Sequence, residues 1–97
     1  MNMEQLAELC HESLQMYRIF NDLPKQESWL LLPEYEKDTM REMTKMSLSG
    51  ALPSRLHSYY CFRTCSRNID FQYLDLVVQY QYCLLADIVK SLNLVIS

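Results

Sequence analysis

The chain has 97 residues, of which 49% are hydrophobic, and it carries a net charge of −3 with one glycine and three prolines. This length suits one domain around one hydrophobic core, and the hydrophobic fraction excludes an intrinsically disordered chain. So few glycines and prolines exclude an all-β domain, which needs tight turns roughly every 8 to 12 residues. We therefore expect a single all-α domain over residues 1–97.

The charge distribution and the lack of long apolar runs narrow the class of partner. Residues 1–50 carry nine acidic and five basic side chains, which disfavours duplex nucleic acid. No apolar run approaches the roughly 20 residues of a membrane span, and the N-terminal residues do not resemble a signal peptide. We expect a cytoplasmic protein that does not bind a membrane, with free and mostly buried thiols at Cys10, Cys61, Cys65 and Cys83.

Caps and apolar spacing predict the first two elements. Asn2 and Gln5 form the pattern of a capping box, and apolar residues then recur with helical spacing, so the first helix spans about 3–20. A cluster of turn-forming residues at 21–24 ends this helix. The apolar segment 29–32 is too short to classify by its period, and we expect it to cross the core.

A second helix is predicted between Pro33, which suits a first helical turn, and Gly50, which ends the helix. Acidic residues near its start favour the positive end of the helix dipole. Its inward stripe is predicted to be Tyr35, Met40, Met43, and Met46 or Ser47. Methionine stripes serve both irregular cores and adaptable interfaces, and the core is the preferred interpretation here.

Pro53 and Asn68 bound a third predicted helix, and Asp70 caps a fourth apolar stretch. This fourth stretch, 71–93, has the most regular apolar spacing in the chain. At about 1.5 Å per residue a continuous helix there would be roughly 35 Å long, longer than so small a domain. Either this helix breaks or its end meets a partner.

These elements predict a bundle of about four helices with a long C-terminal helix, leaving room for a short hairpin near 47–54 or 64–70. No internal repeat is evident. Three tyrosines lie partly off the apolar stripe of the last helix, and interfaces favour exposed tyrosine. We therefore expect a homo-oligomer formed through a face that bears Tyr73, Tyr80 and Tyr82.

The first half of the chain carries a spaced set of residues, namely His11-Glu12, Tyr17, Trp29 and Pro33-Glu34-Tyr35, followed by a helix and Gly50. This arrangement resembles the RyR-type domain of phage and bacterial proteins, which is named after repeats in the ryanodine receptor. That family begins with a similar Cys-His-Glu on a helix, a tyrosine six residues after the histidine, and a Trp-x-x-x-Pro-Glu-aromatic element. The second half matches more loosely, at Leu56-His57 and in the closing helix, and it lacks the family's glycine-, tryptophan- and lysine-rich hairpin.

The resemblance implies a compact helical module that senses a ligand or binds a protein, rather than a catalyst. Such domains are often encoded by phages or fused to signalling proteins, and some members are suspected to recognise nucleotide-derived signals. For a stand-alone phage protein, the natural extension is sequestration of a defence messenger in the host cytoplasm.

A metal site is one alternative use of the third predicted helix. His57, Cys61 and Cys65 are four residues apart, and on a helix this spacing aligns an imidazole and two thiolates that would suit zinc. Structural zinc sites usually pair cysteines as Cys-x-x-Cys on turns, however, and a cysteine on an apolar helix face is more often a small core residue. We expect no metal and no cofactor.

Catalytic motifs are not found in the sequence. His11-Glu12 lacks the second histidine of a His-Glu-x-x-His motif, because position 15 is Gln15. No phosphate-binding loop or nucleophile elbow is present either. His11 is expected to make a structural hydrogen bond, and we expect no enzymatic activity.

The best candidate site in the sequence is the third predicted helix, where arginines alternate with tyrosines. Guanidinium groups grip phosphate in a fork and tyrosines stack on a base, so this pattern suits a small phosphorylated ligand. Three arginines over thirteen residues are too few for a duplex-binding stripe, and the alternative is a solvated face with tyrosines packed inward. The candidate ligand-binding residues are Arg55, Tyr59, Tyr60, Arg63 and Arg67, with His11, Tyr17, Trp29 and His57 as secondary candidates.

Two functions remain open at this level. In the first, a phage-encoded, non-enzymatic protein captures a nucleotide-derived signalling ligand, as a sponge or a sensor that counters host defence. In the second, the protein is an interaction inhibitor that docks on a host protein through its acidic and tyrosine-bearing helical faces. The first predicts stabilisation by cyclic or NAD-derived nucleotides, and the second predicts one dominant protein partner.

Overall fold

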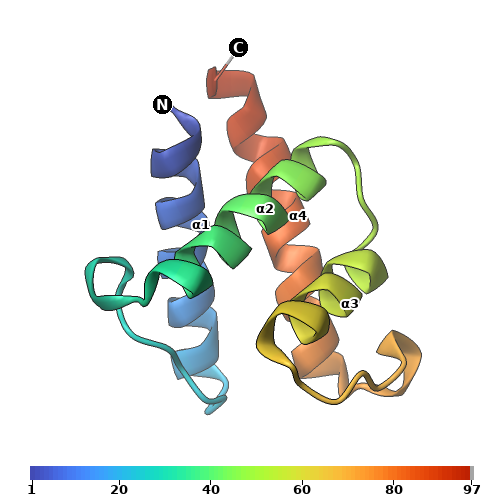
Figure 1. Cartoon of the computed structure of the whole chain (residues 1–97). Helices are drawn as coiled ribbons and strands as arrows, with labels where there is room; N and C mark the ends of the chain where they lie inside the picture. Colours follow the sequence, from blue (N-terminus) through green and yellow to red (C-terminus); the bar gives the residue numbers. More distant parts are fainter. Residues whose placement is uncertain (97) are drawn as a thin grey trace.

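Four α-helices and two short 3-10 helices make up the computed structural model, which describes residues 1–96, with side chains through Leu92. In chain order the elements are α1 (Met3–Phe20), η1 (Trp29–Leu31), α2 (Glu34–Leu48), α3 (Pro53–Thr64), η2 (Phe71–Tyr73) and α4 (Leu76–Ile96). The predicted all-α bundle of about four helices with a long last helix is confirmed (Figure 1). No strand occurs in residues 1–96, so neither of the two segments considered for a hairpin forms one.

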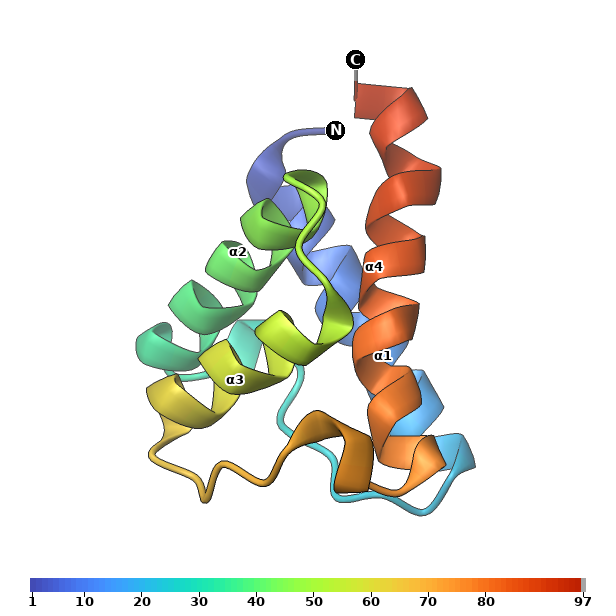
Figure 2. The ribbon, with the colours of Figure 1, turned by 90° about the vertical axis from the view of Figure 1, so that its right-hand side faces the viewer.

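The chain consists of two halves with the same order of elements. Each half is a helix, a 3-10 helix and a second helix: α1, η1 and α2 in the first, and α3, η2 and α4 in the second. In both halves the 3-10 helix begins five residues before the second helix, at Trp29 before Glu34 and at Phe71 before Leu76. Helices α2 and α4 pack against each other, and each also packs against α1 and α3 (Figure 1, Figure 2). Exchanging the halves leaves this contact pattern unchanged, as expected of a pseudo-twofold arrangement.

A buried histidine of α1 holds η1 in place. The Nε2–H of His11 donates to the Glu27 carbonyl at 2.8 Å, and the His11 ring lies 5.9 Å from the ring of Trp29. The Glu12 carboxylate accepts the backbone N–H of Trp29 at 2.8 Å. We refer to His11, Glu27 and Trp29 as the first latch, because they fasten the connector (residues 21–28) to α1.

The second half repeats this geometry in a second latch, formed by His57, Ile69 and Phe71. The Nε2–H of His57 donates to the Ile69 carbonyl at 2.9 Å, and the two rings lie 6.1 Å apart. In each latch the accepting carbonyl lies two residues before the 3-10 helix. Because a carbonyl only accepts, Nε2 carries the proton in both histidines. An internal repeat is therefore present in the geometry, although none was evident in the sequence.

The hydrophobic core lies between the four helices. Its fully buried aliphatic side chains are contributed by α1, α3 and α4, and they include Leu6, Leu56, Leu85 and Val89. Helix α2 adds Met40, Met43 and Ser47, which confirms most of the predicted inward stripe. Tyr35 is 54% exposed, so its place in that stripe is wrong. The first buried residues of α2 are Thr39 and Met40. One helical turn before them, the side chain on the same face of the helix is that of position 36 rather than that of position 35.

The segment at 29–32 does not cross the core, which corrects the expectation from the sequence. In η1 the side chains at positions i and i+3 lie on the same side, so Trp29 and Leu32 both point inward and are buried. Leu30 and Leu31 face outward and are 83% and 69% exposed. The segment therefore lies along the surface of the bundle, anchored at its two ends.

The third helix begins at Pro53 as predicted but ends before Asn68, and the fourth helix begins later than predicted. Helix α3 ends at Thr64, because Cys65 adopts a left-handed backbone conformation with φ 54° and its N–H bonds back to the Cys61 and Phe62 carbonyls. The fourth apolar stretch breaks, so that Phe71–Tyr73 form η2 and α4 starts only at Leu76. No helix in the described part of the chain is both long and apolar enough to cross a membrane.

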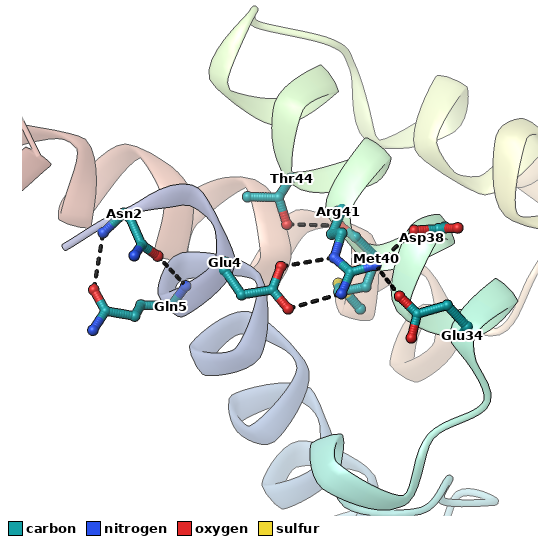
Figure 3. A network of polar contacts seen from close by, with 8 residues as sticks. All are labelled: Asn2, Glu4, Gln5, Glu34, Asp38, Met40, Arg41 and Thr44. Carbon is teal, nitrogen blue, oxygen red and sulfur yellow. Dashed lines mark hydrogen bonds and ion pairs between the residues drawn. The ribbon is translucent and has the colours of Figure 1, made fainter.

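An ion-pair cluster joins the start of α1 to α2 (Figure 3). Arg41 makes a two-bonded contact with Glu4, at 2.7 Å from Nε and 2.8 Å from Nη2. Its Nη1 also donates to Glu34 and Asp38, at 2.9 and 2.6 Å. Beside this cluster, Asn2 and Gln5 form the predicted capping box, with each side chain accepting the backbone N–H of the other.

The Arg41 cluster makes stability depend on pH on the acid side. The hydrogen bond from Arg41 lowers the pKa of Glu4 below its ordinary value of 4.5. A lowered pKa in the folded state means a contribution that is present above the unfolded pKa and is lost as the pH falls through the folded value. We expect Glu4→Gln to lower the melting temperature at about pH 7 and to have little effect at about pH 3, by circular dichroism. Glu8→Gln, outside the cluster, is the control, and an equal loss at both pH values for Glu4→Gln would contradict the pairing.

Candidate functional site

A cavity of suitable size and chemistry for a small ligand lies between the helices. Its volume is about 340 Å³, and it is walled by residues of α1, α2, α3 and α4 and by part of the connector. Ligand pockets of proteins usually measure about 300 to 1,000 Å³ and are mostly apolar with a few polar groups. We refer to it as the Arg18 cavity, after the cation in its wall.

The walls of the Arg18 cavity come in equivalent pairs from the two halves. Residues are equivalent when they lie at the same distance from the latch histidine or from the start of the second helix of their half. The pairs are Leu14 and Tyr60, Thr39 and Gln81, Met40 and Tyr82, and Met43 and Leu85. The cavity therefore lies on the pseudo-twofold interface between the halves.

Two features of the first half break this symmetry. Arg18 follows His11 by seven residues, and the equivalent position in the second half is Thr64, which does not line the cavity. The first latch also spans more chain, because Trp29 comes 18 residues after His11 whereas Phe71 comes 14 residues after His57. The longer connector supplies its residues 23–26 to the cavity wall. The first half thus adds both the cation and one side of the opening.

Arg18 is held only by neutral partners. Its Nε donates to the Gln81 side-chain oxygen at 2.7 Å, and its Nη1 donates to those of Gln15 and Gln26 at 3.0 and 3.5 Å. Among the side chains that the structure describes, through Leu92, every ion pair involves Arg41, and Nη2 of Arg18 makes no hydrogen bond. Burial lowers the pKa of the Arg18 guanidinium, although arginine stays protonated in proteins. The cavity therefore contains a partly buried positive charge without a counter-ion.

Gln15 positions both the cation and the connector. Its side-chain oxygen accepts from Arg18 and from the backbone N–H of Gln26, the latter at 3.0 Å, while its amide donates to the Gln26 carbonyl. Gln15 is itself buried. Because one buried amide contacts both groups, the guanidinium and the connector side of the opening are fixed relative to each other.

Two tyrosines form the aromatic part of the wall. The rings of Tyr60 and Tyr82 lie 6.4 Å apart at an angle of 64°. Because His57 Nε2–H donates to the Ile69 carbonyl, Nδ1 carries no proton and is an acceptor. The Tyr82 hydroxyl donates to this Nδ1 at 3.1 Å. Burial raises the pKa of both tyrosines, so both rings remain neutral. No aspartate or glutamate is among the residues that line the cavity.

No family model, curated protein or solved structure matches the chain. The resemblance to the RyR-type domain therefore stays a prediction. The function has to be inferred from the geometry of the molecule itself.

The structure divides the arginine-tyrosine set of α3 between three places. Arg55 and Tyr59 line a shallow surface hollow, and Arg63 donates to the Tyr59 hydroxyl at 3.4 Å. Tyr60 faces the Arg18 cavity instead. Arg67 lies in the exposed loop after α3, because the helix ends before it. The structure thus brings together Arg55, Tyr59 and Arg63. Tyr60 and Arg67 lie outside the surface that these three residues form.

The four secondary candidates hold the fold together, and none of them lines the Arg18 cavity. His11 and Trp29 belong to the first latch, and His57 belongs to the second. Tyr17 joins α1 to α4, because its hydroxyl donates to the Val77 carbonyl at 2.6 Å and its ring lies 5.5 Å from that of Tyr80.

The cysteines are free, and they are less uniformly buried than expected. Cys10 and Cys61 are buried, whereas Cys83 is half-buried and Cys65 is exposed beyond the end of α3. The Cys61 sulfur lies 3.6 Å from His57 Nε2. Within residues 1–96 no group of three or more histidine, cysteine or acidic side chains is placed to hold a metal ion.

The tyrosine face expected on the last helix is smaller than predicted. Tyr82 is buried in the core of its own chain, so it takes no part in such a face. Tyr73 and Tyr80 remain exposed. Self-association through these two tyrosines stays a prediction.

The sequence interpretation missed Arg18, although a signal for it was present. Arg18 lies four residues after the buried Leu14 on α1, so it shares the inward stripe of an amphipathic helix. A charged residue in line with an apolar stripe marks either the edge of the core or a buried polar site.

Proposed function

We propose that this protein is a non-enzymatic binding protein that captures a small organic anion in the Arg18 cavity. The observation that carries the proposal is a guanidinium in a mostly apolar cavity with amide partners and no counter-ion. A buried cation is unfavourable unless it is paired, and hydrogen bonds to a charged acceptor are about twice as strong as neutral ones. An anionic ligand would supply that acceptor.

The size of the cavity supports a small ligand. A volume of about 340 Å³ lies at the lower end of the range for ligand pockets. A nucleotide-type ligand with one base, as the RyR-type resemblance implies, is the first class to test. For a phage-encoded protein, such capture would lower the free concentration of a host signalling molecule, which is the wider role we propose.

The chemistry of the wall supports holding a ligand rather than converting it. Neither His11 nor His57 lines the cavity, so the wall offers no imidazole as a general acid or base. The tyrosine hydroxyls are kept neutral by burial, and Arg18 stays charged. A fixed cation and fixed aromatic rings suit recognition, and general acid–base catalysis needs a group whose pKa lies near the working pH.

The proposal predicts that binding depends on Arg18 and not on the arginines of α3. We expect Arg18→Gln to weaken anion binding by about 10- to 100-fold, since a hydrogen bond to a charged group contributes roughly 1.5–3 kcal/mol. Arg18→Lys keeps the positive charge but lacks the planar guanidinium, so its affinity for the anion should lie between those of the natural chain and Arg18→Gln. Thermal shift and isothermal titration calorimetry with a nucleotide panel measure both effects. Arg63→Gln, on α3, is the matched control, and loss of binding in this variant with normal binding in Arg18→Gln would move the site to the α3 surface.

A further inference from the structure

We propose that the ligand of the Arg18 cavity is a monoanion, with one carboxylate or phosphodiester group against Arg18 and an apolar or aromatic body directed toward Met43 and Leu85. This inference rests on the proposed function, because it assigns the chemical class of the ligand held at the same site. It follows from the number of charges in the wall, their surroundings, and the change in polarity from the opening to the floor.

The cavity offers one shielded positive charge. Its only cations are Arg18, which is partly buried, and Lys25, which is exposed on the connector. Water and salt screen an exposed lysine, so it compensates a buried negative charge only weakly. One negative charge is therefore neutralised by Arg18, and a second would be removed from water without a partner.

The surroundings of the opening disfavour further negative charge. A neighbouring groove of about 810 Å³ shares Lys25 and Gln26 with the lining of the Arg18 cavity. That groove is lined by three carboxylates, those of Glu12, Glu27 and Glu36, and by one lysine. Glu36 also raises the pKa of Tyr60 in the cavity wall, after the larger effects of burial, which raises this pKa, and of Arg18, which lowers it. A ligand with several phosphates would have to extend into this negative region.

The polarity of the wall assigns the two ends of the ligand. Among the lining residues, Pro24 and Lys25 are exposed and so mark the opening, whereas Met43 and Leu85 are buried and mark the inner end. The Tyr82 hydroxyl is already used on His57, so it has no proton left to donate to a ligand. The inner end therefore offers packing surface and few donors, which suits a hydrocarbon chain or a flat ring.

Two ligand series with matched bodies test the monoanion. The first is octanol, octanoate and octyl phosphate, and the second is adenosine, 3′,5′-cyclic AMP and 5′-AMP. At about pH 8 the members of each series carry about zero, one and two negative charges, because the second pKa of a phosphomonoester is about 6. Dissociation constants are measured by calorimetry for the full chain, for Arg18→Gln and for Lys25→Gln.

In at least one series we expect the singly charged member to bind at least tenfold more tightly than the neutral and doubly charged members. Arg18→Gln should remove this preference, and Lys25→Gln should change it by less than about threefold. A preference confined to the octyl series would assign a carboxylate, and one confined to the adenosine series would assign a phosphodiester. Tighter binding of the doubly charged member would overturn the monoanion while leaving anion capture intact. If no member of either series bound the natural chain more tightly than Arg18→Gln, the proposed function itself would fail.

Discussion

Replacing Leu85 with alanine is expected to lower the free energy of unfolding by about 2–5 kcal/mol. Leu85 is 0% exposed and lies in the floor of the Arg18 cavity, on α4. Truncation removes buried methyl groups and enlarges a space that already exists, and the cost of such a change grows with the volume left empty. Urea unfolding followed by circular dichroism measures the loss from the shift of the midpoint.

Leu30 provides a matched control for this substitution. It is the same residue type in the same chain, and it is 83% exposed on η1. Leu30→Ala should change the free energy of unfolding by less than about 0.5 kcal/mol, as is usual for surface positions. Equal losses for Leu85→Ala and Leu30→Ala would mean that the floor of the cavity is not part of the packed core.

The parts of the fold that the sequence predicted correctly depend on local signals. The capping box of Asn2 and Gln5 and the turn residues after Phe20 fix both ends of α1, and the structure confirms these ends. The inward methionines of α2 follow from helical spacing alone. In each case the residues that decide the element lie within one or two helical turns of each other.

The parts that could not be predicted depend on contacts between distant segments. Apolar spacing runs without interruption from η2 into α4, so the pattern cannot show that Phe71 belongs to a separate 3-10 helix held by His57. Cys65 ends α3 in a left-handed conformation that cysteine rarely adopts, and no glycine or proline marks that position. The two latches share the histidine, but the accepting residue, the aromatic residue and the spacing between histidine and aromatic residue all differ, which hides the repeat from a reading of the sequence.

The sequence indicated the kinds of side chain in the candidate site, but not which residues supply them. A guanidinium beside tyrosines was the expected combination, and the Arg18 cavity has that combination with a different arginine. Neighbouring residues on a helix point about 100° apart, so Tyr59 and Tyr60 face different surfaces although they are adjacent in the sequence. Which tyrosine meets an arginine is decided by how α3 packs against α2 and α4, and the spacing within α3 contains no information on that.

The two latches should contribute unequally to stability. Both ring nitrogens of His57 are hydrogen-bonded: Nδ1 accepts from the Tyr82 hydroxyl and Nε2–H donates to the Ile69 carbonyl. His11 uses only Nε2, and its buried Nδ1 has no hydrogen-bond partner within the described residues. Each buried polar group left unpaired costs about 1–3 kcal/mol, so His57→Phe should destabilise the protein roughly twice as much as His11→Phe.

A double-mutant cycle separates this hydrogen bond from the loss of packing. Tyr82→Phe removes the donor of the His57 bond and keeps the ring in the wall of the Arg18 cavity. Once His57 is replaced by phenylalanine, Tyr82→Phe should cost less than it does in the natural chain, by a coupling energy of about 0.5–3 kcal/mol. Additive losses in urea unfolding would contradict the bond between the two side chains. Coupling would show that the second latch supports the aromatic wall of the cavity, and a weakened latch would then lower ligand affinity without any change at Arg18.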